Sequence, residues 1–199
     1  MKHSVEQGPL ELLAAWYAEA REHPEVRYVG AACLATIDDH DRPDARMVIV
    51  REVGEAGCLF ATDSRSVKIR QLTTNPNAAL TFYWGLLDRS VRIRGRVEEA
   101  SPADADRCFG DRPRRSKLTV WASHQSRPLE SRDDLVARYD EVQERFGGDD
   151  DIPRPDTWRA YRLVATEVEF WQAATARLHD RRLFRMGPEG EWQASRLEP

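Results

Sequence analysis

Short stretches rich in apolar side chains recur along much of the chain and predict β-strands. Five such stretches follow one another, at residues 28–37, 46–51, 58–62, 78–84 and 91–97. The last stretch alternates strictly, with arginine at every second position, so its charged side chains share one face. Turn-forming segments such as DDHDRPD separate the stretches, which predicts an antiparallel meander. We expect a closed or split β-barrel, because closure removes the exposed edges of a sheet.

Apolar residues at helical spacing predict helices around this barrel. The clearest lie at about residues 9–23, 67–72, 101–109 and 135–146. The first begins at a proline and the last ends before two glycines, as helices commonly do. We interpret residues 121–126 as a loop over a site. Strands and helices together predict one α+β domain over residues 1–199, in which the leading helix is followed from about residue 28 by the barrel and its helices.

Residues 170–184 are predicted to form a β-hairpin whose side chains could bind a ligand. A strand over residues 164–171 runs into an Ala/Thr turn, and the RLHDR segment that follows alternates polar and apolar side chains. Alternation would place three side chains on one face: Arg177, His179 and Arg181. Two fixed charges and an imidazole suit an anionic or electron-rich ligand. A solvated strand face, neutralised by neighbouring carboxylates, explains the same residues. The last strand is predicted at residues 192–197.

Composition and charge argue against binding to nucleic acid, a metal site and a membrane span. Of the 199 residues, 41% are hydrophobic and 32% charged, which is typical of a globular protein. The net charge of −4 gives no general electrostatic case for binding nucleic acid. The five histidines and three cysteines lack the spacing of metal ligands, so we expect no metal site. No apolar run approaches the length of a membrane span and the N-terminus lacks a signal-peptide core, so a cytoplasmic protein is expected.

Cationic and hydroxyl side chains gather at four places: Arg46, Ser66 with Lys68, Arg112 with Ser116, and Arg177 with His179. Ser66 and Lys68 stand at the start of a predicted helix, whose free N–H groups suit a phosphate. Guanidinium groups beside a serine suit phosphate or carboxylate. A phosphorylated cofactor or an anionic substrate would explain all four places. A ligand-binding barrel without catalysis would explain them equally well.

Seven ordered blocks resemble the pyridoxamine 5′-phosphate oxidase family: RMVIVR, SVKIRQL, NPNAALTFYW, RIRGRVE, RPRRSKLTVWASHQS, VEFWQ and RLHDR. The resemblance runs from about residue 28 to residue 199. It implies an FMN-binding split β-barrel that forms a homodimer, with FMN at the subunit interface. It also implies an oxidase that passes a hydride from pyridoxamine or pyridoxine 5′-phosphate to the flavin. Oxygen then reoxidises the flavin, so the products are pyridoxal 5′-phosphate and hydrogen peroxide.

The resemblance also implies site residues. Those for FMN are the strand Arg46, Met47, Val48, Ile49, Val50 and Arg51, together with Ala61, Thr62, Ser66, Lys68, Gln125, Ser126, Trp171 and Arg181. Among them, Gln125 and Ser126 are expected to come from the partner subunit. Those for the substrate are Arg51, Arg112, Ser116, Arg177 and His179, of which Arg177 and His179 are expected to be catalytic.

Five positions depart from the family's usual residues. Arg51 replaces a lysine and Cys108 a tyrosine near the substrate phosphate, and Ala61, Val67 and Ser90 replace larger polar residues near the flavin. The sister branch of phenazine-biosynthesis flavin oxidases shares the barrel and the RLH segment, and oxidises reduced tricyclic precursors. That branch, and a flavin-binding barrel with little turnover, remain alternatives. Retention of RLHD argues against the second, because a mere binder has no need of substrate-side residues.

Overall fold

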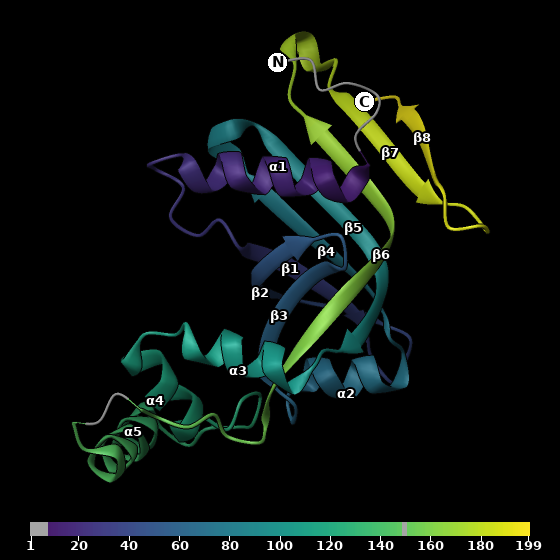
Figure 1. Cartoon of the computed structure of the whole chain (residues 1–199). Coiled ribbons are helices and arrows are strands. Elements are labelled where there is room, and N and C mark those ends of the chain that lie inside the picture. The colour runs from purple at the N-terminus through teal and green to yellow at the C-terminus, as the bar shows by residue number, and fades with distance from the viewer. Residues whose placement is uncertain (1–7, 149–150) are drawn as a thin grey trace.

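A six-stranded antiparallel barrel forms the centre of the computed structural model, which describes residues 8–148 and 151–199 (Figure 1). Its strands are β1 Ala31–Ile37, β2 Pro43–Gly54, β3 Gly57–Asp63, β4 Asn77–Trp84, β5 Arg89–Glu99 and β6 Trp158–Gln172. They pair in the order β3-β2-β1-β4-β5-β6, and pairing of β3 with β6 closes the ring. The split barrel and its opening β1–β2–β3 meander are therefore confirmed.

The period of two in the sequence becomes the inside and outside of the barrel. In β5, Val91, Ile93 and Val97 are buried, whereas the arginines between them are exposed. Gly95 stands at a bulge against β6, where a Cβ atom would lie 1.9 Å from the carbonyl oxygen of Val164. Only glycine allows that close approach.

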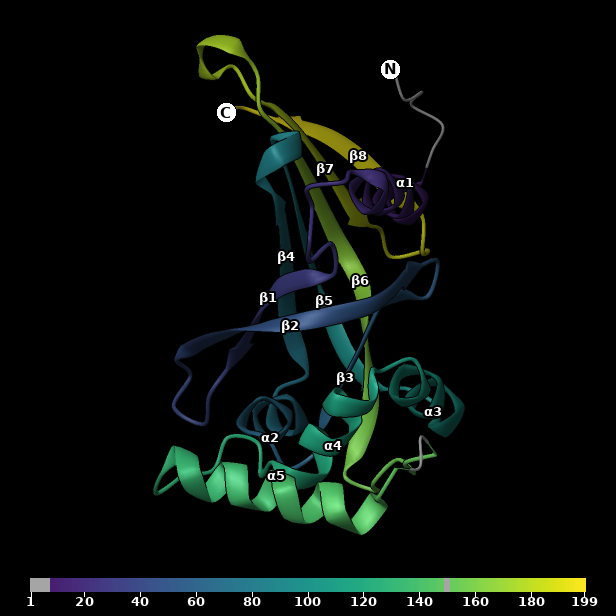
Figure 2. The same ribbon diagram turned by 90° about the vertical axis from the view of Figure 1, so that its left-hand side faces the viewer.

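Helices cover both ends of the barrel: α1 Pro9–Glu22, α2 Val67–Thr74, α3 Pro102–Gly110, α4 Arg114–Ala122 and α5 Arg132–Phe146. The expected caps Ser101 and Ser131 accept hydrogen bonds from the backbone N–H groups of Asp104 and Asp134. Helix α1 lies at one end and buries Trp16 edge-on against Phe170. Helices α2 to α5 lie at the other end (Figure 2). The expected loop over residues 121–126 is partly wrong, because Trp121 and Ala122 belong to α4.

Strands β7 Asp180–Met186 and β8 Trp192–Leu197 extend the sheet beyond the barrel from β6. The expected hairpin exists, with Gln172 paired to Asp180, but its second strand begins later than the alternation suggested. Residues 175–177 form a short 3-10 turn, η2, and His179 precedes β7. Arg177 and His179 therefore do not share a strand face with Arg181. Among the described residues, no helix is both long and apolar enough to cross a membrane.

Candidate functional site

One pocket, of about 360 Å³, opens beside β2 and is called the β2 pocket here. Its lining comes from β2, β3, α2 and the segments around α4: Met47, Val48, Ile49, Arg51, Ala61, Thr62, Lys68, Arg112, Gln125 and Trp158. Three of these side chains are cationic and none is acidic. The lining therefore suits an anionic group attached to an apolar or aromatic body.

Strand β2 divides the stretch Arg46–Arg51 between two faces. Met47, Ile49 and Arg51 point outward, whereas Val50 is 1% exposed and belongs to the core. Arg51 is the extra residue of a β-bulge, because Val50 pairs with Phe60 and Glu52 with the adjacent Leu59. Bulges redirect a side chain at a functional site. The side chain of Val50 therefore does not line the β2 pocket, and the expected contact of the whole stretch with FMN stays a prediction.

The guanidinium of Arg46 is engaged within the protein and does not line the β2 pocket. It donates to the hydroxyl of Thr36, to the carboxylate of Asp44 and to the amide oxygen of Gln71. Gln71 in turn donates to Asp44 at 2.9 Å. Arg46 thus ties β2 to β1 and α2, which is a structural task that the sequence pattern did not reveal.

Lys68, Thr62 and Gln125 form the polar floor of the β2 pocket. The Lys68 ammonium donates to the amide oxygen of Gln125 at 3.1 Å and to the Thr62 hydroxyl at 3.3 Å. Burial, with a further contribution from the charge of Arg46, lowers the pKa of Lys68 to about 8. Gln125 makes these contacts within its own chain, and its expected contact with a ligand across the subunit interface stays a prediction. Ser126 is exposed and lies outside the pocket lining.

Ser66 immediately precedes α2 and is fully buried. Its hydroxyl oxygen has no hydrogen-bond partner among the described residues and does not cap the helix. A buried hydroxyl without a partner costs about 1–3 kcal/mol. The orphaned hydroxyl, the start of a helix and the nearby Lys68 together suit a phosphate group.

Arg112 lies in the same pocket as Arg51, and burial, with a further contribution from the charge of Arg51, lowers the pKa of Arg112. Its guanidinium lies 4.7 Å from the centre of the Trp158 ring and donates to the carbonyl oxygen of Ser116 at 3.4 Å. Ser116 is half-buried and does not line the pocket. Trp158 is missing from the sequence-based set. In the sequence, Trp158 could be noticed only by its position at the start of a long strand, after a proline-rich segment. A tryptophan at such a position looks like an ordinary core residue.

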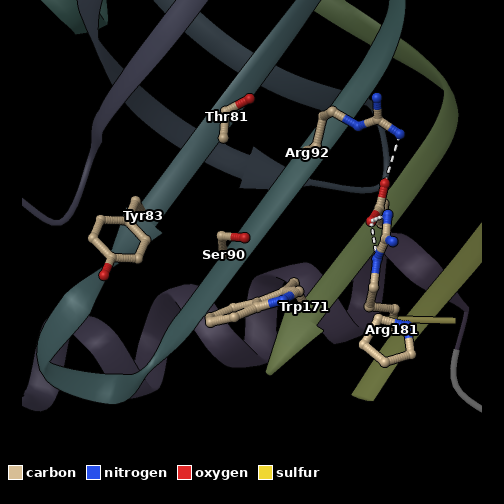
Figure 3. Close-up of a pocket in the computed structure, with 8 residues that line it drawn as sticks. Thr81, Tyr83, Ser90, Arg92, Trp171 and Arg181 are labelled. Atoms are coloured by element: carbon tan, nitrogen blue, oxygen red, sulfur yellow. Dashed lines mark hydrogen bonds and ion pairs between the residues drawn. The ribbon is translucent and has the colours of Figure 1, made fainter. Parts of the chain in front are cut away.

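A second pocket, of about 500 Å³, lies on the outer face of β4 to β7 and is called the β6 pocket here. Its lining residues are Thr81, Tyr83, Ser90, Arg92, Glu169, Trp171, Arg181 and Pro199 (Figure 3). Glu169 accepts from Arg92 at 2.6 Å and from Arg181 at 2.6 and 2.9 Å. Trp171 and Arg181 therefore line the same pocket of one chain.

The η2 turn contains Arg177, and His179 follows it and contacts Trp171 of the β6 pocket. Ala176 and Arg177 have φ values of 54° and 61°, in the left-handed region that non-glycine residues seldom adopt. The His179 ring lies 4.7 Å from that of Trp171, and its Nδ1 accepts the backbone N–H of Ala174 at 3.3 Å. A neutral His179 therefore carries its proton on Nε2, which is free to donate.

The expected substrate residues fall into two separate groups in the single chain. Arg51 and Arg112 belong to the β2 pocket near α3 and α4, whereas the connection between β6 and β7 lies at the opposite end (Figure 2). The two pockets nevertheless open on the same outer face of the sheet. Paired residues link them across adjacent strands: Met47 to Cys33, Cys33 to Thr81, Thr81 to Arg92 and Arg92 to Glu169.

Two family models together match most of the chain. Residues 19–146 match the model described as pyridoxamine 5′-phosphate oxidase. Residues 158–199 match the pyridoxine 5′-phosphate oxidase C-terminal dimerisation region, which supports a homodimer. The second match contains Trp171, Arg177, His179 and Arg181.

Curated relatives and solved structures agree with these matches. The chain is 43% identical over 195 residues to the pyridoxine/pyridoxamine 5′-phosphate oxidase of Ralstonia pickettii, covering 98% of this chain and 91% of the relative. It is 43% identical over 192 residues to the enzyme of that name from Azorhizobium caulinodans, with 96% and 90% covered.

PhzG from Burkholderia lata 383, solved with tetrahydrophenazine-1-carboxylic acid, superposes with a TM-score of 0.90 at 30% identity, covering 98% and 95% of the two chains. An FMN-binding protein from Nostoc punctiforme, at 17% identity and a TM-score of 0.77 with 98% and 100% covered, shares the fold. The chain belongs to the pyridoxamine 5′-phosphate oxidase family.

Proposed function

We propose that this protein is an FMN-dependent oxidase of pyridoxamine and pyridoxine 5′-phosphates that uses oxygen as acceptor. The observation that carries the proposal is the β2 pocket, where Arg51, Lys68 and Arg112 line an apolar cavity without an acidic side chain. Relatives that are 43% identical carry the name of this activity.

The residues present fit FMN. The buried Ser66 hydroxyl without a partner, the start of α2 and the Lys68 ammonium would hold the FMN phosphate. Thr62 and Gln125 would fix the position of that ammonium. The exposed apolar face of Met47 and Ile49 would lie against the ring system. Bound flavin supplies the hydride acceptor and the reaction with oxygen.

The protein's own groups bind and orient the substrate. Arg51 and Arg112 would take its phosphate, because their guanidinium groups share a pocket and lack carboxylate partners among the described residues. Arg177 would lie over the substrate ring and favour loss of a proton from the oxidised group. The Nε2–H group of His179 would donate to the substrate, since Nδ1 is occupied by Ala174.

A complete site requires a second copy of the chain. Helices α3 and α4, which flank Arg112 in the chain, and the β6–β7 connection, which contains Arg177, lie at opposite ends of one chain (Figure 2). Both pockets nevertheless open on the same sheet surface. A twofold dimer brings the same surface of both protomers together in opposite orientations. The β2 pocket at one end of this surface would then face the β6 pocket at the other end of the partner's surface. Exposed apolar side chains on this surface, including Met47, Ile49 and Tyr83, would then be buried.

A second candidate function is oxidation of reduced phenazine precursors. It is favoured by the likeness to PhzG, whose solved structure contains tetrahydrophenazine-1-carboxylic acid. Arg51 and Arg112 would bind a carboxylate as well as a phosphate, because a guanidinium matches both. Peroxide formation should be measured with pyridoxamine 5′-phosphate, pyridoxine 5′-phosphate and a reduced phenazine carboxylate. Turnover of the two vitamin phosphates supports the first function, and turnover of the phenazine alone would replace it with the second.

A further inference from the structure

The indole of Trp158 lies against the guanidinium of Arg112 and is itself held firmly. Trp158 is 7% exposed and packs with Phe109 and Leu118, from the two helices that flank Arg112 in the chain. Its carbonyl oxygen accepts from Arg154 at 2.8 Å. The ring is therefore a buried, packed aromatic surface against the guanidinium, whose Cζ lies 4.7 Å from the ring centre.

Arg112 has little other support inside the protein. Among the described residues it pairs with no carboxylate, and its buried Nε has no hydrogen-bond partner. The charged side chain that contributes to the lowered pKa of Arg112 is Arg51, another cation. A buried N–H group without a partner is costly, so this edge of the guanidinium is arranged for a ligand oxygen.

A small cavity of about 110 Å³ adjoins the β2 pocket and shares Arg112, Gln125 and Trp158 with it. Asp63 also lines this cavity, but its carboxylate is bound to Arg65 at 2.7 Å. The Arg112 and Trp158 side chains thus line both cavities, and the one acidic residue of the two linings already pairs with Arg65.

We propose that Trp158 is a positioning residue that fixes the plane of the Arg112 guanidinium for the substrate's phosphate. An aromatic face attracts the cation without using its N–H groups, which all lie in the guanidinium plane. A carboxylate partner would stabilise the cation equally but would occupy the donors that the substrate needs. The inference rests on the proposed function and deepens it, because it assigns the orientation of one phosphate-binding group to a residue outside the expected site.

The test compares two Trp–Arg stacks of similar geometry. Trp121 on α4 lies 4.9 Å from the Arg145 guanidinium and lines neither cavity, so Trp121→Leu is the matched control for Trp158→Leu. FMN-loaded protein is titrated with inorganic phosphate by calorimetry. The ratio of kcat/KM for pyridoxamine 5′-phosphate to that for pyridoxamine is measured in parallel, because a merely structural defect would lower both values together.

We expect Trp158→Leu to weaken phosphate binding and to lower the kcat/KM ratio, each by about tenfold, and Trp158→Phe to have a smaller effect because it keeps an aromatic face. Arg112→Lys should match Trp158→Leu, since an ammonium has no planar fork. Trp121→Leu should leave both values unchanged.

Wild-type phosphate affinity in folded Trp158→Leu, or an equal loss in Trp121→Leu, overturns the proposal. If Trp158→Leu does not fold, unchanged affinity in both Trp158→Phe and Arg112→Lys overturns it instead. Failure of the proposed function would give a different result from failure of this inference. The protein would oxidise neither vitamin form, but its phosphate binding would still depend on Trp158.

Discussion

Thr62 and Gln125 are 63 residues apart in the chain, yet the Thr62 hydroxyl donates to the Gln125 amide oxygen at 2.6 Å. Lys68 donates to both side chains, so one amide oxygen helps to position the cation assigned to the FMN phosphate. This contact brings the segment after α4 to the barrel and completes the polar floor of the β2 pocket.

Gln125→Glu should weaken FMN binding by roughly tenfold, equivalent to about 1.4 kcal/mol. The new carboxylate would pair with Lys68 and repel the phosphate. Dissociation constants from flavin fluorescence titration measure the effect. Gln143→Glu, on the exposed side of α5, is the matched control and should bind FMN normally. Equal affinities in the two variants would disprove the role of Gln125.

FMN binding should weaken as the pH rises through about 8, where Lys68 loses its proton in the ligand-free protein. The pKa is depressed from 10.5, so the unfolded chain binds more protons between pH 8 and 10.5. The contribution of Lys68 to the stability of the ligand-free protein therefore rises with pH in that window, opposite to the trend in FMN affinity. Lys68→Arg stays charged and should show a flat FMN affinity from pH 7 to 9. A parallel decline in this variant would assign the pH dependence to another group.

Arg177→Ala should lower kcat/KM by roughly 10²-fold, the usual scale for a group that assists proton transfer. FMN affinity should stay at the wild-type value, because Arg177 lies outside both pocket linings. His179→Gln should be milder than His179→Ala, since its amide oxygen still accepts the Ala174 N–H group. Stopped-flow spectroscopy measures the rate of flavin reduction in each variant. Arg185→Ala, on the exposed part of β7, is the control. Normal reduction rates in Arg177→Ala would exclude the catalytic role.

Glu169→Ala should destabilise the protein by about 2 kcal/mol, because it leaves Arg92 and Arg181 without the buried carboxylate between them. Glu99→Ala breaks the exposed pair with Arg159 and should cost less than about 0.5 kcal/mol. Urea unfolding at one fixed protein concentration compares the two. Similar losses would show that burial of Glu169 adds nothing to its ion pairs.

The strands and most helices followed from local patterns, because burial in a barrel repeats every second residue. Alternation predicted strand β5, and the capping residues Ser101 and Ser131 predicted the starts of helices α3 and α5. Closure of the barrel by β3 and β6 pairs residues about a hundred positions apart, as in Cys58 with Leu163, and no local pattern encodes it. Alternation misled at RLHDR, where left-handed backbone at Ala176 and Arg177 interrupts the strand.

The site was predictable as a set of residue types but not as an arrangement. The cations near Ser66 and Arg112 were identified from charge and helix starts. The Arg46 guanidinium donates hydrogen bonds to Asp44 and Gln71, and sequence spacing does not reveal these contacts. The same holds for Trp158 under Arg112 and for Gln125 beside Lys68. Family resemblance supplied the site residues, and the geometry places some of them in the two pockets and others outside both linings.

The most direct test of the two-subunit site is complementation between Arg112→Ala and Arg177→Ala. Each variant alone should be nearly inactive with pyridoxamine 5′-phosphate. Mixed, unfolded and refolded together, they should recover about a quarter of wild-type activity, because half of the dimers are mixed and each mixed dimer has one intact site of two. No recovery, with mixed dimers demonstrated by mass spectrometry, would mean that Arg112 and Arg177 act within one chain and would contradict the account.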